Sequence, residues 1–121
     1  ADTLPACLAS LTEGQDLDLE FLVINDGSTD ATAAVLDAWA LRDSRLRVLH
    51  REGRGLTRSL IEGCAEARGV YIARQDAGDR SLPGRFARQV ERLEADATAT
   101  FCSTHVRLLA EEVAPRVADL H

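Results

Sequence analysis

The chain has 121 residues, of which 45% are hydrophobic, and its formal net charge is -6. This size suffices for one hydrophobic core, so we expect a single domain over residues 1–121. Affinity for nucleic acid comes largely from clustered basic side chains, so the acidic balance argues against a nucleic-acid partner. Charged residues interrupt every apolar stretch before it reaches the roughly 20 positions that a membrane-spanning helix needs.

The three cysteines, Cys7, Cys64 and Cys102, are far apart and odd in number. Their spacing predicts neither a disulfide framework nor a zinc site. The N-terminal residues also lack the basic segment and apolar core of a secretory signal. We therefore expect buried, reduced thiols in a cytoplasmic protein, with the cytoplasmic face of the membrane as an alternative location for the full-length form.

The first third of the chain predicts a helix, a strand and a second helix. Apolar residues at helical spacing in residues 3–14 indicate a short amphipathic helix that ends near Gly14. Residues 19–25 form a nearly continuous apolar run, typical of a strand covered on both faces. Ser28 or Thr29 is expected to cap the next helix. The inner face of that helix carries three large apolar residues, Val35, Leu36 and Trp39.

The middle of the chain continues the alternation of strands and helices. A short strand is predicted at 46–49, followed by a Gly-rich loop at 52–55. A helix over 56–68 should end at Gly69, because glycine readily adopts the left-handed conformation that closes helices. The apolar residues 70–73 then predict another strand.

The last third contains an acidic turn at 75–79 and a helix that starts near Pro83. One face of this helix carries Phe86, Val90 and Leu93. Residues 99–109 indicate one more strand. Because parallel strands need crossover helices, this alternation predicts a three-layer α/β/α sandwich with a mainly parallel sheet. The chain opens on a helix, where such a fold opens on its central strand, so either the first strand is missing or the fold is a variant.

Two acidic turns follow predicted strands. Ligands of open α/β sheets bind beyond the carboxyl ends of the strands, so Asn25–Ser28 and Asp76–Asp79 are expected to face one crevice. Carboxylates there can accept hydrogen bonds from a ribose or an imide, and can hold a divalent cation that bridges a diphosphate. The alternative is that Asp26 and Asp76 are only turn residues, since Asp and Gly favour turns for local reasons.

The residues around these turns resemble one family. Val23–Thr32, which reads Val-Ile-Asn-Asp-Gly-Ser-Thr-Asp-Ala-Thr, is similar to the signature of family 2 glycosyltransferases. Gly55–Leu60 resembles the family's Gly-Leu segment, and Gly69–Asp79 resembles the strand leading into its metal-binding Asp-x-Asp motif. The helix behind that motif is matched by Pro83, Arg85 and Gln89. The resemblance covers nearly the whole chain to about residue 109.

This resemblance implies a GT-A fold and an inverting enzyme that moves a sugar from a UDP- or dTDP-sugar donor to an acceptor hydroxyl. It also implies bacterial polysaccharide or glycoconjugate biosynthesis. By the same comparison residues 1–121 form an incomplete domain, which lacks the family's first strand and its acceptor half. The acceptor and the catalytic base are therefore not assigned to any residue of this chain.

Carried over residue by residue, the family pattern assigns binding of the nucleotide-sugar donor to Asn25, Asp26, Gly27 and Asp76, with Asp26 on the base. Asp76 and Asp79 would hold Mg²⁺ or Mn²⁺. The usual acidic ligand at the third motif position is replaced by Gly78, which has no side chain to bind a metal.

Two alternatives to an enzyme of this kind stay open. One is a non-catalytic nucleotide- or partner-binding module in which the metal site has decayed at Gly78. The other is a nucleotidyltransferase, which should carry a Gly-rich, Lys-bearing loop that this sequence lacks. Unpaired strand edges also predict self-association of the truncated chain.

Overall fold

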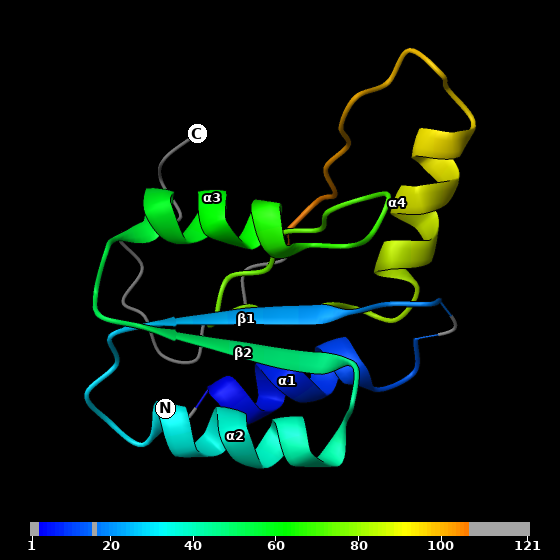
Figure 1. Ribbon diagram of the computed structural model, residues 1–121. Coiled ribbons are helices and arrows are strands. Elements are labelled where there is room, and N and C mark those ends of the chain that lie inside the picture. The colour runs from blue at the N-terminus through cyan, green and yellow to red at the C-terminus, as the bar shows by residue number, and fades with distance from the viewer. Residues whose placement is uncertain (1–2, 16, 107–121) are drawn as a thin grey trace, which may run out of the picture.

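The computed structural model describes residues 3–15 and 17–106. The elements follow the order α1 (Leu4–Thr12), β1 (Phe21–Asp26), α2 (Thr32–Arg42), β2 (Leu46–Arg51), α3 (Leu56–Glu66) and α4 (Arg85–Glu94). β1 and β2 pair in parallel, in a register that runs from Phe21 opposite Leu46 to Asp26 opposite Arg51. Figure 1 shows α3 over one face of this sheet and α1 and α2 over the other. The architecture is therefore α/β, and the expected sandwich is seen only as this two-strand unit.

The hydrophobic core lies between the sheet and the helices α1 and α2. Leu8 and Leu36 are its most buried large side chains, at 2% and 1% exposure. Val35 and Trp39 pack against it, which confirms the predicted inner face of α2. Each fully buried side chain of this kind contributes roughly 1.5–3 kcal/mol relative to leaving it in water. The buried apolar residues are Leu4, Cys7, Leu8, Leu11, Phe21, Leu36, Leu46 and Phe86.

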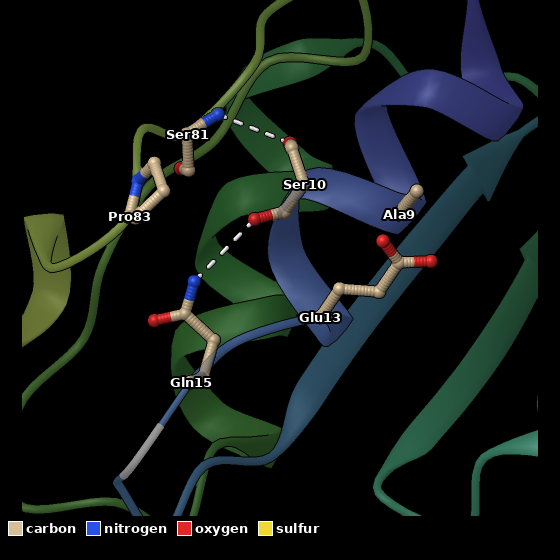
Figure 2. A pocket seen from close by; sticks show the side chains of 6 residues that line it. All are labelled: Ala9, Ser10, Glu13, Gln15, Ser81 and Pro83. Atoms are coloured by element: carbon tan, nitrogen blue, oxygen red, sulfur yellow. Dashed lines mark hydrogen bonds between the residues drawn. The ribbon is translucent and has the colours of Figure 1, made fainter.

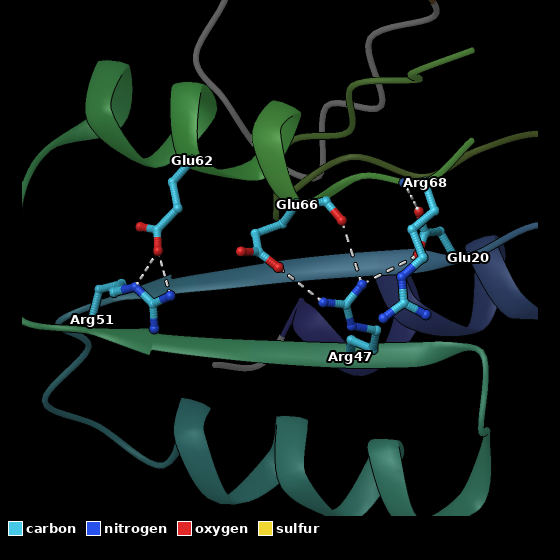
Figure 3. A network of polar contacts seen from close by, with 6 residues as sticks. All are labelled: Glu20, Arg47, Arg51, Glu62, Glu66 and Arg68. Carbon is cyan, nitrogen blue, oxygen red and sulfur yellow. Dashed lines mark hydrogen bonds and ion pairs between the residues drawn. The ribbon is translucent and has the colours of Figure 1, made fainter. Parts of the chain in front are cut away.

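Ion pairs attach α3 to the sheet (Figure 3). Arg51 of β2 donates to Glu62 through Nε at 2.7 Å. Arg47 reaches both Glu66, at 3.2 Å, and Glu20, at 3.5 Å. The apolar residues of α3 contribute little to this attachment, since its Leu and Ile side chains are largely exposed. Leu56, Leu60 and Ile61 are 63%, 37% and 65% exposed.

Two predicted strands do not form. Residues 70–73 form a bend followed by irregular backbone that pairs with no described strand, with Val70 90% and Ile72 59% exposed. Residues 99–106 also form no strand, and 107–109 lie outside the described residues. A strand needs a neighbour for its backbone groups. In the described part of the chain β1 pairs with β2 alone. No further described strand therefore lies at the other edge of β1 to pair with residues 70–73.

The predicted helix ends need two corrections. α2 is preceded by Ala31 without a side-chain cap, and the carboxylate of Asp30, rather than Ser28 or Thr29, accepts the Thr32 N–H at 3.0 Å. α3 ends at Ala67, which is extended, so Gly69 does not close it. Both errors have a local cause, because several neighbouring residues could each supply the same end.

The three cysteines differ in how far they are buried. All three cysteines are free, but only Cys7 is buried, whereas Cys64 is exposed and Cys102 is half-buried. Cys64 corrects the expectation of buried thiols, because it lines an open cavity between α3, α1 and β1 instead of packing in the core. None of the helices in 3–15 and 17–106 has both the length and the apolar character required to cross a membrane.

Candidate functional site

Asp26, the last residue of β1, is held by the Gly-rich loop that follows β2. Its Oδ1 accepts the backbone N–H of Arg54 and its Oδ2 that of Gly55, both at 2.7 Å. Gly27 allows this close approach, since it has φ +79° and a Cβ added there would lie 2.9 Å from the nitrogen of Gly53. The two loops at the carboxyl edge of the sheet therefore meet backbone to backbone.

The same contacts control the charge of Asp26. The backbone N–H of Arg54 lowers the pKa of its carboxyl most; desolvation, the next largest effect, raises it, and the N–H of Gly55 lowers it again. The group is therefore a carboxylate at neutral pH. A carboxylate offers about four lone-pair positions, of which two are taken here, so the others can accept hydrogen bonds from a ligand. An imide N–H or a ribose hydroxyl has the chemistry to supply them.

Asn25 shapes the turn around Asp26. It is only 6% exposed, and its Oδ1 accepts the N–H of Ser28 at 3.2 Å. Its Nδ2 then faces Nδ1 of His50 at 3.1 Å, so this ring nitrogen is the acceptor. Nε2 of His50 donates to Asp37 at 2.9 Å. The side chain of Asn25 is thus occupied in holding the turn, and its role toward a nucleotide stays a prediction.

The second acidic turn is closed by the N–H of Asp79, which donates to the carbonyl of Asp76 at 3.0 Å. The carboxylate of Asp76 receives Nε and Nη2 of Arg74 at 3.0 and 3.3 Å. This ion pair is exposed, at 56% and 59% of the two side chains. A Cβ added at Gly78 would meet nothing within 4 Å. The turn therefore presents two accessible carboxylates and an open backbone.

A cavity of about 750 Å³ lies between α1, β1, α3 and residues 69–77. Asp76 and the thiol-bearing Cys7 line it, and Cys7 Sγ lies 3.7 Å from the Asp76 carbonyl. No hydrogen bond or ion pair between described residues joins this turn to the one at Asp26. A crevice shared by both turns therefore stays a prediction. Residues 3–15 and 17–106 also contain no group of three or more His, Cys, Asp and Glu placed to hold a metal ion.

Comparison with known proteins identifies the chain's family. The model of "Glycosyl transferase family 2" matches residues 1–117. The chain belongs to this family. Membership implies the GT-A fold, as the resemblance did, and it agrees with the signature residues around Asp26.

Curated relatives of the family 2 chain include bacterial glycosyltransferases. It is 34% identical over 88 residues to "Uncharacterized glycosyltransferase EpsJ" of Bacillus subtilis, covering 73% of this chain and 26% of that protein. It is 35% identical over 92 residues to "Putative glycosyltransferase EpsH" of the same organism, covering 76% and 26%. It is 33% identical over 96 residues to "Succinoglycan biosynthesis protein ExoO" of Rhizobium meliloti, covering 78% and 27%. The chain spans about a quarter of the length of these relatives.

Sequence patterns do not indicate the structural roles of two residues at these turns. His50 has no second potential ligand at metal-binding spacing in the sequence, so spacing alone gives it no role. Its contact with Asn25 arises only when β1 and β2 pair. The second residue, Arg85, matches the family helix in sequence, but no spacing rule links it to the acidic turn that it contacts.

Proposed function

We propose that the protein transfers a sugar from a UDP- or dTDP-sugar to an acceptor hydroxyl with inversion at the anomeric carbon. The observation that carries this proposal is the fixed, ionised carboxylate of Asp26 at the carboxyl edge of the sheet, within a family 2 signature. The name of the relative ExoO, a succinoglycan biosynthesis protein, supports polysaccharide biosynthesis as the setting.

In this proposal Asp26 binds the nucleotide through its two unused lone-pair positions. Because the backbone of residues 54 and 55 already orients the carboxylate, little reorganisation is needed when the base arrives. Gly27 lets the backbone of Gly53 pack against the turn, and Asn25 holds the turn in shape. The acceptor hydroxyl loses its proton to a base on a part of the full-length protein beyond these residues, and attacks in line with the departing diphosphate.

The acidic turn fits a divalent cation only in part. Asp76 and Asp79 supply two carboxylates, whereas hard cations take six or more oxygen ligands, so donor phosphate and water must supply the rest. The ion pair of Asp76 with Arg74 is exposed, and such pairs contribute about 0–1 kcal/mol, so a cation can displace it. When bound, Mg²⁺ or Mn²⁺ would offset charge on the leaving diphosphate. The residues of the turn would orient that diphosphate.

Calorimetric titration of the full-length protein with UDP tests the nucleotide site. Asp26→Ala removes a charged hydrogen-bond acceptor, which is worth about 1.5–3 kcal/mol, so UDP affinity should fall by roughly 10- to 100-fold. Glu91→Gln on the exposed face of α4 is the control and should leave affinity within about twofold. Equal UDP affinity in Asp26→Ala and wild type would refute the assignment.

A second titration tests the cation. We expect negligible Mn²⁺ affinity without nucleotide and weak but measurable affinity with UDP, because the diphosphate supplies ligands that the protein lacks. Asp79→Ala should abolish the coupling between Mn²⁺ and UDP while leaving UDP binding in EDTA unchanged. Tight Mn²⁺ binding to the nucleotide-free protein would contradict this arrangement.

A second candidate function is a non-catalytic nucleotide-binding module. The observation that favours it is the lack of three potential metal ligands in one group among the residues that the structure describes, together with Gly78 at the usual ligand position. The module and the enzyme differ in one readout. If UDP binds equally well in EDTA and in Mn²⁺, and Asp79→Ala changes neither, the module is the better description.

A further inference from the structure

We propose that Arg85, the first residue of α4, is a positioning residue that holds the acidic turn Asp76–Asp79 in its donor-binding conformation. The inference deepens the proposed function, since it rests on that turn taking the diphosphate of the donor. It concerns a side chain that does not itself touch the donor. Its role is carried by the hydrogen bonds that it makes on both sides of the turn.

The guanidinium of Arg85 contacts the segment that leads into the turn and the segment that leaves it. Nη1 donates to Oε1 of Gln75 at 2.5 Å and to Oγ of Ser81 at 2.9 Å. Nη2 donates to the carbonyl of Arg74 at 2.9 Å. Nε donates to Gln89 at 3.2 Å, one turn along α4, which fixes the plane of the guanidinium. One side chain therefore ties residues 74, 75 and 81 together.

The two segments are anchored to the rest of the fold at the same point. Ser81 is only 6% exposed; its N–H donates to Oγ of Ser10 on α1 at 3.0 Å (Figure 2) and its hydroxyl donates to Gln75 at 2.9 Å. The Gln75 amide in turn reaches the Asp76 carbonyl through Nε2 at 3.5 Å. The carbonyl that closes the turn thus belongs to a network whose centre is Arg85.

A planar guanidinium is needed at this position. Its donors point in fixed directions that match four acceptors on three segments, at residues 74–75, Ser81 and Gln89, whereas a lysine ammonium is a single point charge. The acceptors of Arg85 are amide, hydroxyl and carbonyl oxygens, and no ion pair between described residues includes it. Its contribution is therefore geometric, and a lysine that keeps the charge should not replace it.

The same region has little other support. Residues 70–73 are unpaired, and the turn itself has one closing hydrogen bond, from Asp79 to Asp76. Backbone that lacks sheet or helix partners opens locally at low free-energy cost. Without Arg85 the turn should sample other conformations, and the two carboxylates would be ordered only when a cation and a diphosphate bind. Binding through the turn then weakens, whereas binding through Asp26 does not.

The experiment compares Arg85→Lys with Arg88→Lys in the full-length protein. Arg88 lies exposed on the same helix, so its replacement matches the chemistry of the change without touching the turn. The first readout is amide hydrogen exchange at Asp79 and Ser81. Exchange there should rise at least fivefold in Arg85→Lys and stay unchanged in Arg88→Lys, while exchange in β1 and β2 stays at the wild-type rate in both.

The second readout is UDP affinity in Mn²⁺ and in EDTA. Arg85→Lys should weaken UDP binding about tenfold in Mn²⁺ and less than twofold in EDTA, because only the first condition uses the turn. A merely destabilising substitution would lower both affinities and accelerate exchange throughout the sheet.

Two results would overturn the inference. One is unchanged exchange at Asp79 and Ser81 in Arg85→Lys, and the other is faster exchange there with wild-type UDP affinity in Mn²⁺. A wild-type protein whose UDP affinity is the same in Mn²⁺ and EDTA would instead refute the cation role of the proposed function. In that case, the exchange readout still decides whether Arg85 orders the turn.

Discussion

Replacing Gly27 by alanine tests the contact between the two loops at the carboxyl edge of the sheet. Gly27 has φ +79°, and its added Cβ would lie 2.9 Å from the nitrogen and 3.1 Å from the Cα of Gly53. The left-handed conformation costs a non-glycine residue about 1–2 kcal/mol. The overlap is with backbone, so the loop must move, and overpacking of this kind costs about 1–3 kcal/mol. Gly27→Ala should therefore destabilise the protein by about 2–5 kcal/mol.

Two other glycines separate these contributions. Gly53 has φ +70° but open space around its Cβ position, so Gly53→Ala should cost only the conformational share, about 1–2 kcal/mol. Gly78 has no positive φ and no neighbour within 4 Å, so Gly78→Ala should lie within about 0.5 kcal/mol of wild type. Urea unfolding measures the change in free energy of unfolding for each of the three variants, provided that the m-value stays constant.

The order of the three variants decides the interpretation. If Gly27→Ala is no more destabilising than Gly53→Ala, the close contact between the backbones of Gly27 and Gly53 is refuted. UDP titration adds a second check, because movement of residues 53–55 would remove the N–H donors from Asp26. Affinity should fall in Gly27→Ala by more than in Gly53→Ala.

The remaining predictions concern pH and association. The pKa of the Asp26 carboxyl is lowered on folding, so its stabilising effect is complete above the ordinary carboxyl range near pH 4 and is lost as the pH falls through the lowered value. The difference in free energy of unfolding between wild type and Asp26→Asn, measured with urea, should thus be constant from pH 5 to 8 and shrink below pH 4. A difference that grows on acidification would contradict the hydrogen bonds from residues 54 and 55. Residues 1–121 expressed alone should self-associate through the edge of β1 that no described strand covers and through exposed apolar side chains such as Val70 and Ile72. Analytical ultracentrifugation would detect this as species larger than a monomer. A monomer at about 100 μM would count against that surface.

Much of the fold followed from patterns that act over a few residues. The apolar spacing in 3–14 and the continuous run at 19–25 correspond to α1 and β1, and the Gly-rich stretch at 52–55 is a loop. These features depend on which residues are apolar and on where glycine permits a turn, and both are properties of the local sequence. The signature around Asp26 was readable for the same reason, and it led to the family that the comparison confirms.

The errors lie where pairing between distant segments decides the outcome. The residues at 70–73 are as apolar as β1, but a strand exists only when a second segment lies beside it, and among the residues that the structure describes β1 pairs only with β2. The sequence placed Asp26 and Asp76 at the ends of apolar runs. Only the tertiary structure assigns the partners that fix them, backbone N–H groups for Asp26 and the network centred on Arg85 for the second turn. Local patterns thus determined which side chains stand in the two acidic turns. Long-range packing decided what holds them, because hydrogen-bond partners far apart in the chain produce no periodic pattern in the sequence.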